Sequence, residues 1–370
     1  MAIAIKPYTP DWIPAVRAFN ERLAAGHVAA EFRFPESDVP EWLPRLDGRR
    51  IYQDFYLAVD GDDVRGAYIL KFQDFSLRGE IRPLAYYHLP ISEGIVNKAY
   101  SSVGVQMLRG AMKAQPSLFC LGMGGFDRPL PQMLKAMGWS LHAVPFYFKV
   151  NHAARFFRQI ATLRRTASRR LVADLAAFTG VGWAGINILQ RIHGTAADRA
   201  VTAEPISTFG DWADQLWRDT HSRYPMIGSR DRASLDVLYP AGSNFIALKV
   251  SRGVRVVGWA IVLDTQMRNS KYFGNLRVGS IVDCLAAPED ARDVVDAAAR
   301  CLEERGVDLI ACNQAHAAWT AALKAAGFLA GPSNFIFAAS RPLQDRIALV
   351  DWAGGQPYLM RGDGDGPVNL

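Results

Sequence analysis

The sequence predicts an α/β protein made of two copies of one mixed-sheet unit. Three short patterns occur twice, in the same order, along the 370 residues. They are an Asp-Trp pair that leads into a helix, a β-hairpin with a glycine in its second strand, and a helix that ends on a glycine followed by an aromatic residue. Repetition at a nearly constant separation indicates a duplicated unit.

The Asp-Trp pair occurs as Asp11-Trp12 and, 200 residues later, as Asp211-Trp212. The helix endings are Leu134–Trp139 and Leu323–Phe328, which lie 189 residues apart. In both endings the glycine fits the C-cap of a helix, and the aromatic residue begins the next strand. Both patterns therefore place corresponding helices in the two copies.

The two hairpins are expected at residues 56–70 and 246–263. Each consists of two apolar runs joined by a short turn that contains glycine. Gly66 and Gly258 lie inside the second strands, 192 residues apart, where a glycine often marks a bulge. Because this separation lies between the other two, the hairpins support the same duplication.

Each copy is expected to run as strand, helix, hairpin, strand, helix, strand, helix and closing strands. In the first copy the later elements are expected at 84–89 (strand), 101–113 (helix), 118–122 (strand), 130–137 (helix) and 140–150 (strand). In the second copy they are expected at 279–285 (strand), 293–305 (helix), 308–312 (strand), 317–326 (helix) and 334–339 (strand). Strands that alternate with helices after a hairpin predict a mixed sheet flanked by helices.

We therefore expect two tandem domains with a basic helical linker between them. The expected boundaries are 1–150 for the first domain, 151–199 for the linker, 200–342 for the second domain and 343–370 for a C-terminal extension. Half of the residues are hydrophobic and 21% are charged, which excludes a disordered chain. The net charge of +6 permits an anionic partner but is too mild for an obligate nucleic-acid coat protein.

The cysteines and the N-terminus predict a cytoplasmic protein. Four cysteines in a chain of this length form no disulfide framework, and no Cys-x-x-Cys pair exists. The N-terminus lacks the basic start and long apolar stretch of a signal peptide. Residues 171–190 are long enough to span a membrane, but they contain Asp174, Asn187 and three glycines. They favour a shielded or interfacial segment over a transmembrane helix.

The linker combines an apolar stripe with a basic face at helical spacing. The stripe consists of Phe156, Ile160, Leu163, Ala167 and Leu171, and the basic face of Arg155, Arg158, Arg165 and Arg169. One interpretation is a helix packed between the copies with a solvated basic side. The others are peripheral contact with an anionic membrane, which would place the protein at the inner membrane, and binding to tRNA. Contact with tRNA is the weaker of these interpretations.

The element order, together with the endings Leu134–Trp139 and Leu323–Phe328, resembles the GNAT (GCN5-related N-acyltransferase) fold. The resemblance covers residues 1–150 and 200–342, and a tandem arrangement is similar to FemAB-type aminoacyltransferases and other double-GNAT enzymes. It implies transfer of an acyl group from acetyl-CoA or a longer acyl-CoA to an amine, by direct attack in a ternary complex. No metal is implied.

The resemblance also implies a donor loop between the central strand and the following helix, with the pattern Gln/Arg-x-x-Gly-x-Gly/Ala. Backbone N–H groups at such a helix start hold the pyrophosphate of the coenzyme. Both copies depart from the pattern. The first has small residues, hydroxyls and one cation, contributed by Asn97, Lys98, Ser101 and Ser102. The second has four acids within 288–296, so we expect donor binding in the first copy.

A second departure concerns the acid that protonates the departing thiolate. Family members often place a tyrosine four residues before the glycine that closes the last helix. Leu134 and Leu323 occupy these positions here, while Asp127 and His316 stand where the family often has an asparagine. The resemblance therefore implies that a water, another tyrosine or a different donor takes over this step.

Tyr86 and His88 are the candidate catalytic residues of the first copy. They end its central strand, where the resemblance places catalysis, and alternation puts them on one face. Either side chain could accept the amine proton as a general base. The alternative is aromatic packing around a hydrogen-bonded histidine.

Asp283 is the candidate catalytic residue of the second copy, because a carboxylate on a buried strand needs a partner or a task. Its neighbour Cys284 could join Cys312 and His316 in a Cys-His pair or, with Asp283, in a metal site. Cysteines in apolar strands are usually core residues, and we favour that interpretation.

The C-terminal segment 358–367 alternates glycine with aspartate, so we expect it to form no core element. It suits a loop laid over a site, with Asp363 and Asp365 recognising the amine of the substrate. The alternative is a flexible terminus.

These patterns and the GNAT resemblance predict an N-acyltransferase whose acceptor is a small-molecule or sugar amine, such as a nucleotide sugar or a cell-envelope precursor. One alternative is a non-catalytic scaffold in which both copies have lost the donor loop. Another is a FemAB-like transferase that takes its acyl group from aminoacyl-tRNA.

Overall fold

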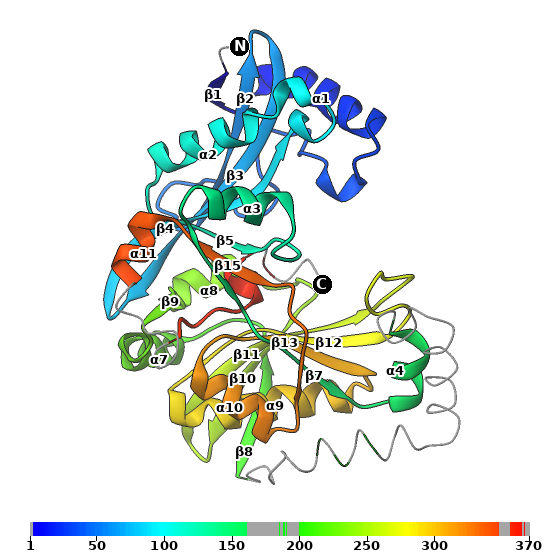
Figure 1. The fold of residues 1–370 in the computed structure, drawn as a ribbon. Helices are drawn as coiled ribbons and strands as arrows, with labels where there is room; N and C mark the ends of the chain where they lie inside the picture. Colours follow the sequence, from blue (N-terminus) through cyan, green and yellow to red (C-terminus); the bar gives the residue numbers. More distant parts are fainter. Residues whose placement is uncertain are drawn as a thin grey trace. The chain divides into compact units, whose positions relative to one another are not determined.

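The computed structural model describes residues 3–160, 200–347 and 356–364, together with residues 185, 188, 190 and 366. The chain forms two compact units. The first unit contains Met1–Ala143 and Ile336–Leu349, and the second contains Val144–Phe335 and Val350–Leu370 (Figure 1). Each unit is built around one mixed sheet, as the sequence predicts.

The sheet of the first unit is antiparallel except for one central parallel pair, β4 with β5. Its strands lie in the order β1 (Ala4–Pro7), β2 (Tyr52–Asp60), β3 (Asp63–Leu77), β4 (Glu80–Ser92), β5 (Leu118–Gly122), β15 (Ile336–Ala339) and β6 (Ser140–Ala143). The hairpin β2–β3 and the strands β4 and β5 confirm the elements predicted at 56–70, 84–89 and 118–122.

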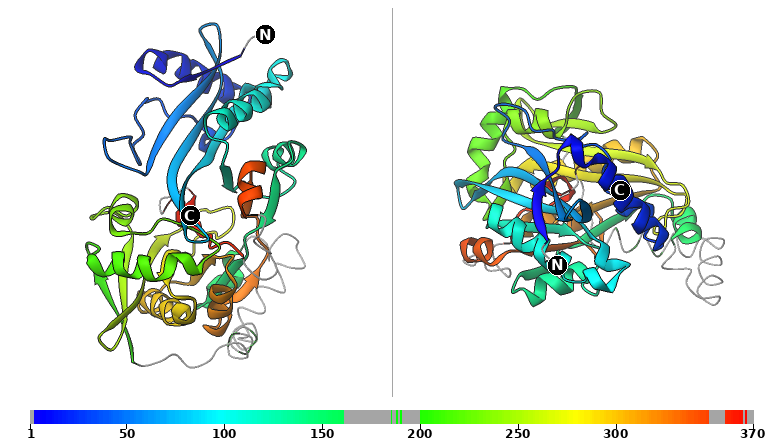
Figure 2. Two further views of the ribbon diagram at one scale, coloured as in Figure 1. Left: turned by 90° about the vertical axis from the view of Figure 1, so that its left-hand side faces the viewer. Right: turned by 90° about the horizontal axis from the view of Figure 1, so that it is seen from above.

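Helices cover both faces of this sheet because the strand residues that point to either face are apolar (Figure 2). Helix α1 (Ile13–Ala25) packs Val16, Phe19 and Leu23 on one face. Helices α2 (Val103–Ala114) and α3 (Pro129–Ala136) pack on the other face. Helix α11 (Arg341–Ile347) follows β15. This layering places α2, the helix that follows β4, beside the central strands β3 and β4.

The second unit repeats the arrangement, with β12 and β13 as its parallel pair. Its strands lie in the order β14 (Leu329–Gly331), β7 (Phe146–Val150), β13 (Leu309–Asn313), β12 (Arg277–Ala286), β11 (Arg255–Gln266), β10 (Ile246–Arg252) and β8 (Val201–Ile206). Its other elements are α4 (Ala153–Gln159), α7 (Asp211–Thr220), the short strand β9 (Met226–Gly228), α8 (Arg232–Leu238), α9 (Ala291–Glu304) and α10 (Ala317–Ala325).

The closing strands of the two copies are exchanged. The strand predicted over 140–150 is interrupted at Val144-Pro145, and proline cannot donate a backbone hydrogen bond to a ladder. Its first part, β6, pairs with β15 from the second copy, whereas its second part, β7, lies between β13 and β14. The compact units therefore differ from the predicted boundaries at 150 and 342.

Glycine positions confirm the duplication. The ladder shifts register next to Ala58↔Gly66 in the first hairpin and next to Val250↔Gly258 in the second, so both glycines mark a bulge. A Cβ on Gly66 would meet Met107 Sδ at 2.6 Å, and one on Gly258 would meet Val294 Cγ2 at 2.4 Å. The bulge thus lets α2 and α9 approach corresponding points of the two sheets.

Of the predicted basic linker, the structure describes residues 151–160 together with residues 185, 188 and 190. Helix α4 packs Phe156 against Val150 and Leu309, and Arg155 contacts Asp308 at 3.1 Å. Ile160 packs against the same cluster, and Arg158 lies in α4. The other residues of the stripe and basic face, and nearly all of residues 171–190, lie outside the part that the structure describes; they are Leu163, Ala167, Leu171, Arg165 and Arg169. Within the described part, no helix has both the length and the apolar character needed to cross a membrane.

Candidate functional site

The parallel pair of each unit separates partway along its length. In the first unit the ladder of β4 with β5 ends at Tyr86↔Phe119, although β4 continues to Ser92. In the second unit the ladder of β12 with β13 ends at Ile281↔Cys312, and β12 continues to Ala286. Beyond these points the two strands are no longer paired in a backbone ladder. We call these places the first and the second wedge.

Tyr86 and His88 lie together at the first wedge. The Tyr86 hydroxyl donates to the Leu121 carbonyl oxygen on β5 at 3.0 Å, and His88 Nδ1 lies 3.3 Å from the same hydroxyl. Because the hydroxyl has a single proton, its oxygen accepts the proton of His88 Nδ1. In the tautomer that donates from Nδ1, Nε2 is the ring nitrogen that can accept a hydrogen bond. Tyr86 is buried, and His88 is partly exposed.

A bulge on β4 accompanies this geometry. The register against β3 shifts between Ala67↔Ile91 and Ile69↔His88, and Leu89 has a φ of 44°. A positive φ is uncommon for a residue with a side chain and marks a point where the strand is redirected. The bulge lies directly after His88, so it helps to fix the end of the strand on which His88 lies.

The predicted donor loop of the first unit precedes α2 as a short helical turn. Asn97 Oδ1 accepts a hydrogen bond from Ala99 N at 3.0 Å, and Ser102, the N-cap of α2, accepts one from Gln106 Nε2 at 3.1 Å. The side chains of Asn97, Lys98, Ser101 and Ser102 are exposed. The loop carries one cation and no acid at the positive end of the α2 dipole.

A buried ion cluster supports this loop from below. Glu93 is 4% exposed and lies 3.1 Å from Arg22 and 3.0 Å from Arg65. The Arg65 guanidinium lies 4.4 Å from the centre of the Tyr100 ring. A Cβ on Gly94 would come within 2.6 Å of the Tyr100 carbonyl oxygen, so the two turns are in direct contact. The cluster therefore fixes the loop in place.

The corresponding loop of the second unit is filled with carboxylates. Asp290, the N-cap of α9, lies 3.1 Å from Arg255 and 3.4 Å from Arg252. Asp293 also contacts Arg252, and both acids are buried. The two arginines thus bind acids of the chain itself at this helix start. An incoming diphosphate would meet two buried carboxylates in this loop, whereas residues 97–102 of the first unit contain none.

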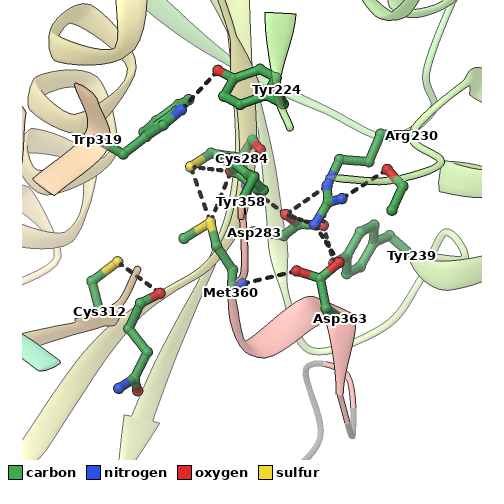
Figure 3. A network of polar contacts seen from close by, with 12 residues as sticks. Tyr224, Arg230, Tyr239, Asp283, Cys284, Cys312, Trp319, Tyr358, Met360 and Asp363 are labelled. Carbon is green, nitrogen blue, oxygen red and sulfur yellow. Dashed lines mark hydrogen bonds and ion pairs between the residues drawn. The ribbon is translucent and has the colours of Figure 1, made fainter. Parts of the chain in front are cut away.

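The second wedge holds the C-terminal segment of the chain (Figure 3). Tyr358 N donates to Met226 O at 2.8 Å, and the Tyr358 hydroxyl donates to the Cys284 carbonyl oxygen on β12. Tyr358, Leu359 and Met360 are at most 1% exposed. The prediction that this segment forms no core element is wrong for these residues, because their apolar side chains pack against β12.

A buried arginine joins two of the predicted site carboxylates, as Figure 3 shows. Arg230 Nη2 lies 2.9 Å from Asp283 and 2.8 Å from Asp363, and the Tyr239 hydroxyl donates to Asp283 at 2.7 Å. Asp363 also accepts from Met360 N at 2.8 Å. Arg230, Asp283 and Asp363 are each 1% exposed. We call these three residues, one arginine and two aspartates, the buried ion triad.

Two acids share one cation in this triad. Burial raises the pKa of Asp283, which outweighs the lowering effect of Arg230. Asp283 and Asp363 both contact Arg230 and are shielded from solvent, so they lie together inside the second unit. Asp365 lies outside the described residues. The proposed roles of the three acids in catalysis and amine recognition stay predictions.

Cys284 and Cys312 lie in the core of the second unit. Cys284 Sγ lies 3.3 Å from the Tyr358 hydroxyl, and burial raises the pKa of Cys284 and, to about 12, that of Cys312. A protonated thiol is a poor nucleophile, so the geometry favours the core interpretation. Burial lowers the pKa of His316 to about 4, and its ring lies edge-on to Tyr224 with centroids 4.8 Å apart.

Comparison with solved structures identifies this arrangement. A structure of Saccharomyces cerevisiae N-myristoyltransferase with bound myristoyl-CoA and inhibitors is similar over 91% of this chain and 79% of its own, with 9% identity and a TM-score of 0.51. The fold is a tandem GNAT fold. A conserved Enterococcus faecalis protein, described as a probable N-acyltransferase, is similar over 93% of this chain and 73% of its own, with 9% identity and a TM-score of 0.51.

No family model matches the sequence, and no curated protein matches it either. Within the tandem GNAT fold, the structure unites Tyr86 with His88 and Asp283 with Asp363. Sequence reasoning missed Arg230 and Tyr358. A signal for the first existed in the buried Asp283, which needs a cation, and a signal for the second in the apolar run Tyr358–Met360.

Proposed function

We propose that this protein is an N-acyltransferase that binds acyl-CoA in its first unit and transfers the acyl group to an amine. The tandem GNAT fold supports acyl transfer, and the myristoyl-CoA bound to N-myristoyltransferase supports an acyl-CoA donor. The observation that carries the assignment to the first unit is the contrast between the two helix starts. The loop before α2 is free of acids, whereas the loop before α9 contains two buried carboxylates.

The residues of the first wedge can supply the proton chemistry of the transfer. The amine nitrogen attacks the thioester carbonyl, a C–N bond forms and the C–S bond breaks, releasing the CoA thiolate. His88 Nε2 accepts the proton that the amine loses, and Tyr86 holds the imidazole by accepting from Nδ1. Leu134 lies where the family often has an acid, so the thiolate takes its proton from solvent.

The acceptor in this proposal is a small-molecule or sugar amine. The second unit serves as a scaffold, since the C-terminal segment lies in its wedge and arginines of the chain pair with the acids of its donor loop. Donor binding by the first unit alone would thus give one donor per chain. Two donors per chain would contradict this division of roles.

The first experiment introduces an aspartate into the loop before α2, at the position where the loop before α9 has Asp290. Ser102 and Asp290 are the N-caps of α2 and α9, so Ser102→Asp places a carboxylate at the proposed pyrophosphate position. Aspartate is a favourable N-cap, so the variant should keep its Tm. We expect calorimetry to show affinity for acetyl-CoA and decanoyl-CoA at least about tenfold weaker than wild type.

Ser37→Asp is the matched control, because it adds the same charge at an exposed position of the loop before β2 and should leave donor affinity unchanged. A second variant, His88→Gln, tests the chemistry. It should bind donors normally and reduce kcat by a factor of about 100 to 10,000. Absence of donor binding to the wild-type protein, or unchanged affinity in Ser102→Asp, would overturn the proposed function.

A further inference from the structure

Three buried polar atoms in one core cluster of the first unit have no hydrogen-bond partner among the described residues. They are the hydroxyls of Tyr68 and Tyr87 and the indole N–H of Trp139. The three side chains are 0%, 1% and 5% exposed. Leaving such groups unpaired in a core is costly, and native structures rarely do so without a reason. Three of them in one core cluster therefore indicate that a partner is missing.

The cluster lies beside the first wedge. Tyr87 is the first residue of β4 beyond the end of its ladder with β5, and Cys120 Sγ donates to the Tyr87 carbonyl oxygen at 3.4 Å. The rings of Tyr68 and Tyr87 have centroids 5.3 Å apart. Burial raises the pKa of both tyrosines, so both hydroxyls stay protonated and can donate a hydrogen bond.

The second copy provides an internal control for these polar groups. Leu70↔Tyr87 in the first sheet corresponds to Val262↔Ile281 in the second, which aligns Tyr87 with Ile281. The two other polar residues also correspond to apolar ones: the hairpins align Tyr68 with Ala260, and the helix endings align Trp139 with Phe328. This fold therefore packs its core without polar atoms at the three positions, and their presence in the first unit needs another explanation.

The surroundings of the cluster are suited to an apolar guest. Buried and partly buried methionines pack around it from α2, from the residue after β5, and from α3 and its C-cap, namely Met107, Met112, Met123, Met133 and Met137. Methionine side chains are unbranched and flexible, so they can rearrange around a ligand more easily than branched residues. A chain that enters beside Tyr87 would thus meet adaptable apolar groups and three hydrogen-bond donors.

We propose that Tyr68, Tyr87 and Trp139 bind a hydroxyl group on the acyl chain, so that the preferred donor is a hydroxyacyl-CoA. A hydroxyl on the chain can accept hydrogen bonds from two of these groups and donate its own proton to a tyrosine oxygen, whereas a plain fatty acyl chain leaves all three unpaired. This inference rests on the proposed function, because it assumes that an acyl-CoA enters the first wedge. It adds the chemical class of the acyl group.

The test compares donors that differ only in one hydroxyl, by calorimetry on the full chain. The pairs are β-hydroxybutyryl-CoA with butyryl-CoA, and β-hydroxydecanoyl-CoA with decanoyl-CoA. The hydroxylated member of at least one pair should bind about tenfold more tightly. Tyr87→Phe and Tyr68→Phe should each weaken binding of the hydroxylated donor more than binding of the plain donor, and so reduce this preference.

Two results would overturn the inference while the proposed function stands. One is equal affinity for the members of both pairs. The other is a similar loss for plain and hydroxylated donors in Tyr87→Phe, because the hydroxyl would then contact the pantetheine arm that all donors share. If no donor binds at all, the proposed function itself fails, so the two failures are distinguishable.

A measurement without donor checks the premise that the hydroxyls are unpaired. Removing an unpaired buried hydroxyl should leave the Tm of Tyr87→Phe unchanged or higher. Tyr8→Phe is the matched control, since the Tyr8 hydroxyl donates to Pro35 O at 3.3 Å and its loss should lower the Tm. A drop in Tyr87→Phe as large as that in Tyr8→Phe would mean that a trapped water already pairs with the hydroxyl, and would remove the premise.

Discussion

Replacing Arg230 with methionine should destabilise the second unit more than any surface change. The guanidinium lies 2.8 Å from Asp363 and 2.9 Å from Asp283, donates to Gly228 O at 2.9 Å, and lies 5.0 Å from the centre of the Tyr358 ring. Methionine keeps much of the volume but leaves two buried carboxylates without a cation. Breaking a buried ion pair from one side costs about 3–5 kcal/mol.

In a domain of about 150–250 residues, 1 kcal/mol shifts the Tm by about 2–4 °C, so Arg230→Met should lower it by roughly 6–20 °C. Differential scanning calorimetry gives this shift directly. Hydrogen exchange should also show faster exchange in residues 356–364, because the C-terminal segment loses its link through Asp363.

Two comparison variants make the result specific. Arg232→Met removes an arginine whose partner Asp211 is fully solvated, and should change the stability by less than about 0.5 kcal/mol. Asp363→Asn leaves Arg230 paired with Asp283 and removes the surplus negative charge, so it should cost less than half as much as Arg230→Met. The reasoning is refuted if Arg230→Met behaves like Arg232→Met, or if Asp363→Asn is the more damaging change.

Two further predictions concern pH and packing. Burial lowers the pKa of His316 to about 4, so its contribution to the free energy of unfolding is fully present above pH 6.5, where the imidazole is neutral in both the folded and the unfolded state. As the pH falls from 6.5 toward 4, the unfolded state binds the proton first, and the free energy of unfolding decreases by about 3 kcal/mol. Urea unfolding across this range should show a steeper loss in wild type than in His316→Asn, and equal slopes would contradict the prediction. Gly258→Ala should cost about 1–3 kcal/mol and more than Gly66→Ala, because its Cβ would meet the Leu285 carbonyl oxygen at 2.5 Å, whereas that of Gly66 mainly meets the flexible Met107. Chemical unfolding of the two variants checks the order, and a larger loss in Gly66→Ala would refute it.

The sequence predicted the repeated unit because its helix caps and bulges depend on only a few neighbouring residues. Gly138 and Gly327 have φ values of 82° and 83°, as the helix endings predict, and the bulges lie beside Gly66 and Gly258. A left-handed cap and a bulge are decided by a few neighbouring residues. Such features can be read from the sequence without knowing the partner strand.

The exchange of closing strands could not be predicted in this way. Pro145 signals an interruption between β6 and β7, but nothing nearby indicates which sheet either strand joins. That choice depends on pairing with β13, β14 and β15, which lie far along the chain. Strand partners at long sequence separation follow from the packing of the whole fold.

The candidate site was predicted in part, for the same reason. Alternation correctly placed Tyr86 and His88 on one face, and the isolated charge of Asp283 correctly implied a need for a partner. The partner, Arg230, lies 53 residues away on a loop with no motif of its own. The glycine and aspartate content of the C-terminal segment hid the three apolar residues that pack against β12.

Hydrogen exchange of the full chain with and without decanoyl-CoA tests the central claim most directly. We expect donor-dependent protection in the loop and helix over residues 97–108 and at the end of β4, with no change over 288–298 at the start of α9. Protection confined to the second unit would contradict the assignment of the donor site to the first unit. Identical exchange in both states at millimolar donor would contradict acyl-CoA binding altogether.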